Sequence, residues 1–331
     1  MVYVGVDVGA TYIRIGLVNE DGQVINKVKT RQPASGDENT VANVIIKSIR
    51  DLAGGGGIDG IGIGSIGPLD LREGIVPWAP NAPIKRFKLV EPIIKEFKVP
   101  VVLGNDAMAA VWGGEYLFGI GKGVNNLVYI TLSTGIGAGV IVDGHLLVGK
   151  DGNAHEIGHM VIDVNSEIQC GCGGYGHWEA LGSGANIPRV IKEFIKGRSY
   201  RSRLYERLVK GEYVSTEEVF QAYYEGDELA TDFIDNYLMK VHAAGLASVM
   251  NAYDPELIVL GGSMALNNMD LFRRGIEKYL KKYLAVKPAR IEFTRFGDDI
   301  GILGAAALVI KVPESLRTYV EQYRKFLELS Y

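Results

Sequence analysis

The chain has few features of a secreted or membrane protein. Its 331 residues contain only two cysteines, Cys170 and Cys172, which lie too close together in sequence to make a disulfide framework. No apolar run reaches the length that spans a bilayer. The strand pattern VYVGVDVG starts at Val2, without the basic segment that opens a signal peptide. We therefore expect a protein of the reducing cytoplasm with no membrane partner.

The sequence also lacks an excess of positive charge. Lysine and arginine together number 35 and the acidic residues 39, which gives a formal net charge of -4, and the two signs are mixed along the chain. Such a chain presents no broad basic face to nucleic acid, so a small anionic ligand must be bound locally. The length and the 47% hydrophobic content favour two domains with a sizeable core.

An internal repeat organises the chain. Residues 1–30 alternate between apolar and polar side chains, and Asp21-Gly22 is a strong hairpin signal. Residues 126–149 repeat the pattern, with Asp143-Gly144 in the equivalent turn. Each copy predicts three antiparallel strands, so we expect two similar lobes.

Helical patterns fill much of the remaining sequence. Residues 186–250 are mainly helical in pattern, with a capping box at Ser215 and Glu218. Apolar side chains recur at helical spacing from Leu316 to Leu327, which indicates a packed helix near the end of the chain.

Two glycine-containing turns are candidates for phosphate binding. In the first, Asp7 to Thr11 joins two strand patterns, so backbone N–H groups and the Thr11 hydroxyl can approach a phosphate, and Asp7 can orient a hydrated magnesium ion. The alternative is a hairpin in which Gly9 only relieves strain. Residues 132–139, LSTGIGAG, offer hydroxyls and bare backbone in the second copy. Two such turns favour a grip on a polyphosphate.

Asn105 and Asp106 follow the strand pattern VPVVLG and precede a helical pattern. A carboxylate at the end of a strand, facing the crevice between lobes, is well placed to be the general base for an alcohol. The alternative is that Asp106 is an ordinary helix N-cap.

Residues 152–179 hold four zinc-type ligands within nineteen residues: His159, Cys170, Cys172 and His177. Together they complete a tetrahedron with no vacant position, as in structural zinc sites. Glu156 and Glu179 flank these ligands and would be held rigidly as acceptors for the hydroxyls of a bound ligand. The alternatives are reduced thiols near surface histidines, and solvated surface carboxylates.

A buried strand pattern, LIVLGGS from Leu257 to Ser263, ends in a glycine turn before a helical pattern. Bare backbone at this position suits a nucleoside, although many such turns only connect a strand to a helix.

With these motifs assembled, the sequence resembles the ROK family of sugar kinases and related repressors over nearly its whole length. The resemblance rests on six segments: DVGATYIRIG, GIGSIGPLD, GND, TLSTGIGAG, EIGHM with CGCGGYGHWE, and LGGSMA. Most members carry a third cysteine where His177 stands, a proline where Ile66 stands and a glycine where His155 stands.

The resemblance implies a two-lobed, actin-like α/β fold of the ribonuclease H-like type, with duplicated mixed sheets and a cleft between lobes. We expect a small N-terminal lobe at 1–117 and a larger lobe at 118–300 that contains the loop 152–179. Helices at 301–331 are expected to pack at least partly on the small lobe.

The implied sites follow from the matching motifs. Catalysis falls to Asp106, zinc to His159, Cys170, Cys172 and His177, and substrate binding to Gly67, Asn81, Asn105, Asp106, Glu156, His159 and Glu179. The residues expected around ATP are Asp7, Gly9, Ala10, Thr11, Arg14, Ser133, Thr134, Gly135, Gly137, Gly261 and Gly262.

The sequence thus predicts an ATP-dependent hexose kinase that uses ATP, Mg²⁺ and structural Zn²⁺, in which Asp106 accepts the proton of the sugar 6-hydroxyl. An N-acetylhexosamine kinase is the alternative, and a sugar-responsive repressor is a further one, disfavoured because the first strand leaves no room for an N-terminal helix-turn-helix. Family members are often dimers or tetramers, so a homo-oligomer is expected.

Overall fold

The computed structural model describes residues 1–79 and 82–328. Contacts divide the chain into two compact units, which interleave along the sequence. The first unit contains residues 1–129, 138–155 and the segment from Thr294 onward, and the second contains residues 130–137 and 156–293. No helix within the described residues is both long enough and apolar enough to cross a membrane.

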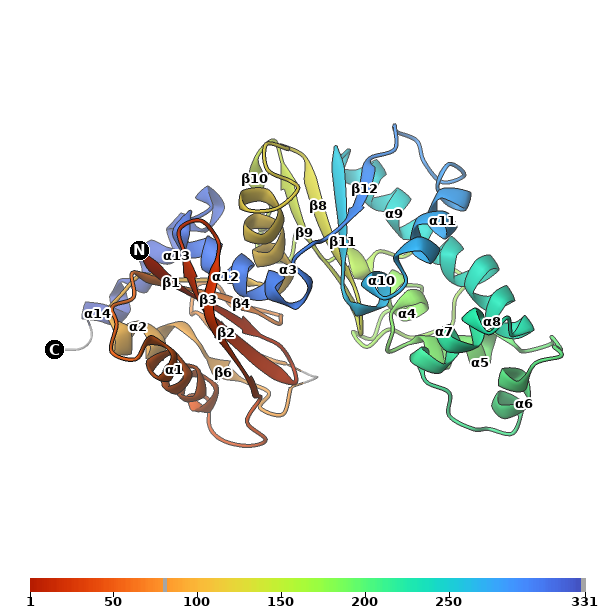
Figure 1. Ribbon diagram of the computed structural model, residues 1–331, viewed down its shortest axis with the longest axis horizontal. Coiled ribbons are helices and arrows are strands. Elements are labelled where there is room, and N and C mark those ends of the chain that lie inside the picture. Colours follow the sequence, from red (N-terminus) through yellow and green to blue (C-terminus); the bar gives the residue numbers. More distant parts are fainter. Residues whose placement is uncertain (80–81, 329–331) are drawn as a thin grey trace. The chain divides into compact units, whose positions relative to one another are not determined.

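The first unit is built on a five-stranded sheet (Figure 1). Its strands are β1 (Val2–Val8), β2 (Tyr12–Asn19), β3 (Val24–Arg31), β4 (Gly60–Ser65) and β7 (Val101–Asn105), in the order β3-β2-β1-β4-β7. β1, β2 and β3 are antiparallel neighbours, whereas β4 runs parallel to β1 and β7 parallel to β4. The three antiparallel strands expected from residues 1–30 are therefore confirmed.

A second five-stranded sheet contains the repeat. It is formed by β8 (Leu127–Leu132), β9 (Ile136–Val142), β10 (His145–Leu146), β11 (Leu257–Gly261) and β12 (Arg290–Phe293), in the order β10-β9-β8-β11-β12. β10 pairs antiparallel with β9, and β12 parallel with β11. The predicted duplication is thus visible as three consecutive strands at one side of each sheet.

Helix α12 (Ile300–Ile310) packs directly on the backbone of the first sheet. A Cβ atom at Gly5 would lie 2.0 Å from the carbonyl oxygen of Ile302, and one at Gly62 would lie 1.7 Å from that of Ala305. Only glycine permits this approach, which explains the glycines at positions 5 and 62. Helices α1 (Thr40–Ala53) and α2 (Val90–Phe97) also contact this sheet.

Helices make up most of the second unit. The capping box predicted at Ser215 and Glu218 is present, with both of its reciprocal hydrogen bonds, at the start of α7. Trp178 and His242 are fully buried, and the indole Nε1 donates to Nδ1 of His242 at 3.3 Å. The helices of this unit are η2 (Ile157–His159), α4 (Trp178–Gly182), α5 (Ile187–Phe194), α6 (Arg203–Val209), α7 (Thr216–Tyr224), α8 (Glu228–Phe233), η3 (Ile234–Leu238), α9 (Met239–Tyr253), α10 (Ser263–Leu266) and α11 (Met269–Leu280).

Residues 316–326 pack within the first unit, where Leu316, Tyr323 and Phe326 are buried. The Tyr323 hydroxyl donates to the carbonyl oxygen of Leu71. The apolar stripe predicted from Leu316 is therefore confirmed as a packing surface. The remaining short elements are β5 (Ile75–Val76), β6 (Phe87–Lys88), α3 (Asp106–Ala109), η1 (Ala110–Leu117), η4 (Gly297–Asp299), η5 (Glu314–Leu316), α13 (Arg317–Tyr323) and α14 (Lys325–Glu328).

Candidate active site and metal centre

The first phosphate-type turn, Gly9 to Thr11, connects β1 to β2 and is held by a residue that sequence reasoning missed. The Gln32 side chain donates from Nε2 to the Gly9 carbonyl oxygen at 2.9 Å, and the Gln32 backbone N–H donates to the Thr11 carbonyl oxygen at 2.9 Å. Gln32 is buried, whereas Thr11 is exposed. A buried side chain therefore fixes the backbone of a turn in which Thr11 stays accessible to solvent.

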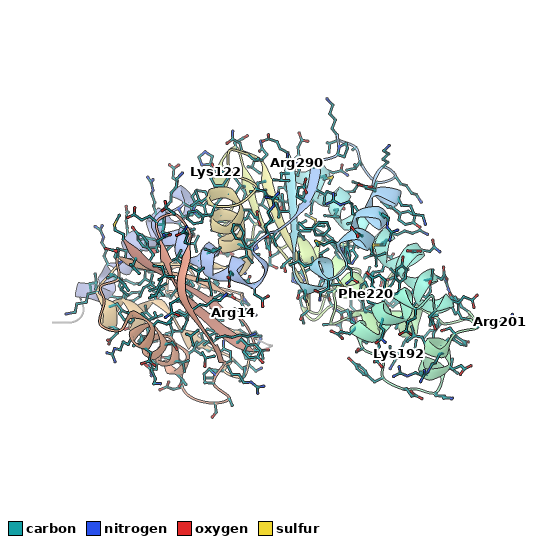
Figure 2. The ribbon with its side chains drawn as sticks, in the orientation of Figure 1. Arg14, Lys122, Lys192, Arg201, Phe220 and Arg290 are labelled. Atoms are coloured by element: carbon teal, nitrogen blue, oxygen red, sulfur yellow. The ribbon has the colours of Figure 1, made fainter. Side chains whose placement is uncertain are left out.

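Asp7 and Arg14 face each other across β1 and β2. Nη1 of Arg14 lies 3.0 Å from Oδ2 of Asp7, whose side chain is 13% exposed. Burial raises the pKa of Asp7, and the Arg14 charge opposes this rise. The ion pair with Arg14 therefore engages Oδ2 of this largely buried carboxylate. Figure 2 labels Arg14 in the first unit.

Asn105, the last residue of β7, is the N-cap of α3. Its Oδ1 accepts hydrogen bonds from the backbone N–H groups of Ala107 and Met108, at 2.9 and 3.4 Å. The alternative in which Asp106 is the N-cap is therefore wrong, because the cap lies one residue earlier. Asp106 is the first residue of the helix, half-buried, and its Oδ1 accepts from Ala107 N at 2.8 Å.

Gly67 lies beside Asn105, since a Cβ atom at Gly67 would be 3.8 Å from Nδ2 of Asn105. With Oδ1 engaged in the cap, Asn105 has its Nδ2 as a donor for a ligand. Asn81, the other residue expected in this set, lies outside the described residues.

The second phosphate-type turn and the LGGS motif come together. Oγ of Ser133 lies 3.0 Å from Oγ of Ser263. A Cβ atom at Gly262, where φ is 85°, would lie 2.4 Å from the Leu132 carbonyl oxygen, so the turn after β11 requires glycine. The two motifs were predicted separately, and the fold makes them neighbours.

A cavity of about 450 Å³ opens beside these two motifs, within the size range of small-molecule sites. Sequence reasoning missed its other walls, which come from α7 and from the segment after α4. Phe220, labelled in Figure 2, is a buried part of the α7 wall. Lining residues include Ser133, Thr134, Gly184, Ala185, Phe220 and Ser263.

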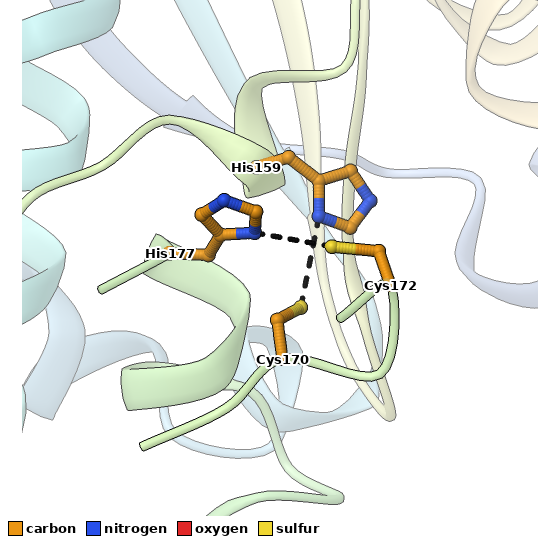
Figure 3. Close-up of side chains that lie close together, drawn as sticks. All are labelled: His159, Cys170, Cys172 and His177. Atoms are coloured by element: carbon orange, nitrogen blue, oxygen red, sulfur yellow. Dashed lines mark hydrogen bonds between the residues drawn. The ribbon is translucent and has the colours of Figure 1, made fainter. Parts of the chain in front are cut away.

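The four predicted metal ligands converge (Figure 3). One ligand atom from each of His159, Cys170, Cys172 and His177 lies within 4.8 Å of the others. Sγ of Cys170 is 3.7 Å from Nδ1 of His159, and Sγ of Cys172 is 3.3 Å from Nδ1 of His177. Ideal bond lengths around tetrahedral zinc place a sulfur and a nitrogen ligand about 3.5 Å apart. The four side chains therefore fit a closed tetrahedral site.

The electrostatics of this cluster also suit a cation. Burial raises the pKa of the Cys170 thiol to about 11, so an ion is needed to hold it as the thiolate. Burial and the neighbouring His159 lower the pKa of His177, which keeps that imidazole in the neutral, ligating form.

The two flanking carboxylates differ in their surroundings. Glu156 is exposed, and its Oε2 lies 3.5 Å from Nε2 of His159, the ring nitrogen that does not face Cys170. Glu179 is half-buried, and its Oε2 accepts a hydrogen bond from the backbone N–H of Ile136 at 2.9 Å. His159 thus faces the cluster with one nitrogen and a carboxylate with the other.

The predicted residues fall into two groups. Asp7, Gly9, Ala10, Thr11, Arg14, Gly67, Asn105 and Asp106 belong to the first unit. The second unit holds Ser133, Thr134, Gly135, Gly137, Glu156, His159, Cys170, Cys172, His177, Glu179, Gly261 and Gly262.

Comparisons with known proteins agree with these motifs. A sequence model described as the ROK family matches residues 3–312. A glucokinase of Pyrobaculum calidifontis is 47% identical over 318 residues, which cover 96% of this chain and 98% of that protein. The ROK hexokinase of Thermus thermophilus has 31% identity and a TM-score of 0.79, covering 93% of this chain and 97% of that one. A ROK family glucokinase from Streptomyces griseus, solved with glucose and AMPPNP, has 29% identity and a TM-score of 0.75, covering 93% and 99%.

Proposed function

This chain belongs to the ROK family and is an ATP-dependent hexose kinase with an actin-like fold, and we propose that glucose is among its substrates and that Asp106 is its general base. The similarity to the glucokinase of Pyrobaculum calidifontis over nearly the full length of both chains carries the proposal. A carboxylate at a strand end and two braced glycine turns supply the chemistry that such a kinase needs.

The nucleotide would be bound through its phosphates and its nucleoside at neighbouring places. The Ser133 and Thr134 turn lines the 450 Å³ cavity, so a nucleoside in the cavity would have its phosphates near this turn. Gly261 and Gly262 would contribute bare backbone at the same wall. In the first unit, Ala10 and Thr11 would supply further backbone donors, since the Gly9 N–H already donates to the Tyr12 carbonyl oxygen. Asp7 would orient the water shell of the Mg²⁺ that arrives with ATP.

The sugar would be held by groups that can hydrogen-bond several hydroxyls. Asn105 offers the donor Nδ2, while Glu156 offers carboxylate acceptors beside Nε2 of His159. Gly67 would allow close approach of the sugar to the backbone. Asn81 and Glu179 complete the proposed set.

Asp106 would accept the proton of the sugar 6-hydroxyl while that oxygen bonds to the γ-phosphorus and the bond from the γ-phosphorus to the leaving oxygen of ADP breaks. Because Asn105 caps the helix, the fold does not need the Asp106 carboxylate for that purpose. General-base catalysis typically contributes about 10²- to 10⁴-fold to a rate.

The cluster of two thiols and two imidazoles would bind structural zinc. It would supply no chemistry, since four protein ligands leave no position for water or substrate. Its effect would be to fix the loop that carries Glu156 and Glu179. Thiolate ligands persist in a reducing compartment, which favours a cytoplasmic location.

A panel of hexoses with Mg·ATP and coupled detection of ADP tests the activity. We expect ADP release that depends on glucose. Preference for N-acetylglucosamine or N-acetylmannosamine over glucose would identify an N-acetylhexosamine kinase instead. The absence of turnover with every sugar would overturn the proposal and favour a sugar-responsive repressor.

We also propose that the protein is a homo-oligomer, either a dimer or a tetramer. For the domains, we propose lobes at 1–117 and 118–300, with helices at 301–331 that pack at least partly on the first lobe.

A further inference from the structure

The segment that follows the metal ligands is hydrogen-bonded to the second phosphate-type turn at three points. The backbone N–H of Gly184 donates to the Ser133 carbonyl oxygen at 2.8 Å, and that of Ala185 donates to the Thr134 carbonyl oxygen at 3.0 Å. The third bond joins Oε2 of Glu179 to the N–H of Ile136 at 2.9 Å. Three hydrogen bonds thus tie this segment to the backbone of Ser133, Thr134 and Ile136.

Glu179 is the side chain in this set, and both of its oxygens are directed at structural neighbours. While Oε2 accepts from Ile136, Oε1 lies 3.8 Å from Sγ of Cys170. A Cβ atom at Gly135 would lie 2.8 Å from Oε2. The carboxylate therefore occupies the space that a side chain at position 135 would fill, so a Cβ atom there would displace it.

We propose that Glu179 is a positioning residue for the nucleotide, beyond its proposed contact with the sugar. By fixing the Ile136 amide, the carboxylate holds the turn so that Ser133 and Thr134 line the cavity. Hydrogen bonds to a carboxylate are stronger than those between neutral groups, so the bond resists displacement of the turn. The identity of the ligand rests on the proposed function.

The proposal predicts that Glu179 affects nucleotide binding in the absence of any sugar. The experiment measures Mg·ADP affinity by calorimetry, without hexose, in the full-length metal-loaded protein. We expect Glu179→Ala to weaken Mg·ADP binding about 10-fold, the effect of one well-placed charged hydrogen bond. Glu179→Gln should bind within about 3-fold of the parent protein, because its amide oxygen still accepts from Ile136 N.

Glu167→Ala is the matched control. It removes an exposed carboxylate of the same loop, 152–179, that forms no hydrogen bond to the turn among the described residues. We expect it to leave sugar-free Mg·ADP affinity unchanged. Metal content and thermal unfolding of each variant are measured in parallel.

Two results would overturn the proposal: unchanged Mg·ADP affinity in Glu179→Ala, or an equal loss in Glu179→Ala and Glu179→Gln. If Glu179→Ala does not fold, Gly135→Ala tests the same contact from the turn, since its Cβ must displace Oε2. It should also weaken Mg·ADP binding, and an unchanged affinity would again contradict the proposal. A parent protein that binds Mg·ADP but phosphorylates no hexose would instead contradict the proposed function.

Discussion

Nε2 of Gln32 donates a hydrogen bond to the carbonyl oxygen of Gly9 at 2.9 Å. The two residues are 23 positions apart, and the bond joins the end of β3 to the turn between β1 and β2. Since the Gln32 backbone N–H also bonds to Thr11, one residue fixes both ends of this turn. The backbone conformation of the first phosphate-type turn therefore depends on a side chain outside the turn.

Replacing Gln32 should impair nucleotide use. In Gln32→Met the side chain keeps its length but loses the bond to Gly9, so we expect the KM for ATP to rise about 3- to 10-fold, the net worth of one hydrogen bond. The KM for the sugar should change little. Steady-state kinetics check this, with the exposed Gln23→Met as the control. Equal ATP dependence in both variants would contradict the bracing role.

Asp106→Asn should bind sugar and lose phosphoryl transfer. The amide hydrogen-bonds a hydroxyl but does not accept its proton at neutral pH, so turnover should fall by at least about 100-fold. Thermal stability should be preserved because Asn105 caps the helix. Sugar binding is measured by calorimetry and turnover by ADP release. A variant that keeps more than about a tenth of the parent turnover would remove Asp106 from the role of base.

Hydroxyl removal at the two turns should affect ATP more than sugar. Thr11→Val and Ser133→Val each delete a hydroxyl from a proposed phosphate site and leave the sugar groups in place, so we expect a higher KM for ATP and a similar KM for hexose. Ser48→Ala, whose hydroxyl bonds to the Val44 carbonyl oxygen within α1, is the control. No change in ATP dependence for either turn variant would argue against phosphate binding by these two turns.

Metal analysis of untagged protein should find about one zinc per chain. Cys170→Ala should lose the metal and unfold at a lower temperature, because it removes a buried thiolate ligand. His177→Cys should keep the metal, since a third thiolate is an equally good ligand. Elemental mass spectrometry gives the stoichiometry, and active protein without zinc would exclude the structural site.

The buried His242 should make folding sensitive to mild acid. Burial lowers its pKa from 6.5 to about 3, so the folded state holds a neutral ring while the unfolded chain takes up a proton below pH 6.5. The contribution of this residue to stability is complete above pH 6.5 and is lost as the pH falls toward 3. Between pH 7.5 and 5 the loss is about 2 kcal/mol.

His242→Gln removes this titration and keeps an acceptor for Trp178, so its free energy of unfolding should fall less between pH 7.5 and 5. Urea unfolding at the two pH values measures the difference. The exposed His145→Gln is the matched control and should retain the parent's pH dependence. An identical pH dependence in His242→Gln would show that His242 does not carry the effect.

Features that depend on local pattern could be predicted from the sequence. Alternation and the Asp-Gly turns indicated the repeated strands, and the spacing of Cys170, Cys172 and His177 indicated a shared site, which the convergence of these side chains supports. Ligands on one short loop are close in space because they are close in sequence. Their spacing therefore predicts a contact in the folded protein.

Features that depend on packing or on backbone register could not be predicted. Gln32 lies outside the turn that it braces. The sequence of α7 predicts a packed helix, but it does not predict that Phe220 also lines a cavity. The helix expected after Asp106 is α-helical for one turn and continues as the π-helix η1, whose hydrogen-bond register leaves no mark on the local pattern. The alternative that made Asp106 the N-cap was wrong by one residue, because Asn and Asp are equally good caps.

The interleaving of the two units bears on synthesis at the ribosome. β1 and β4 emerge early, but α12, which covers their glycine backbone, emerges only with residues 300–310. The stretch from Glu156 to Phe293 is continuous and is complete before that helix is made. Domains usually fold in the order of translation, the N-terminal one first. In this chain the second unit can fold first. One face of the first sheet then stays uncovered until α12 has been synthesised.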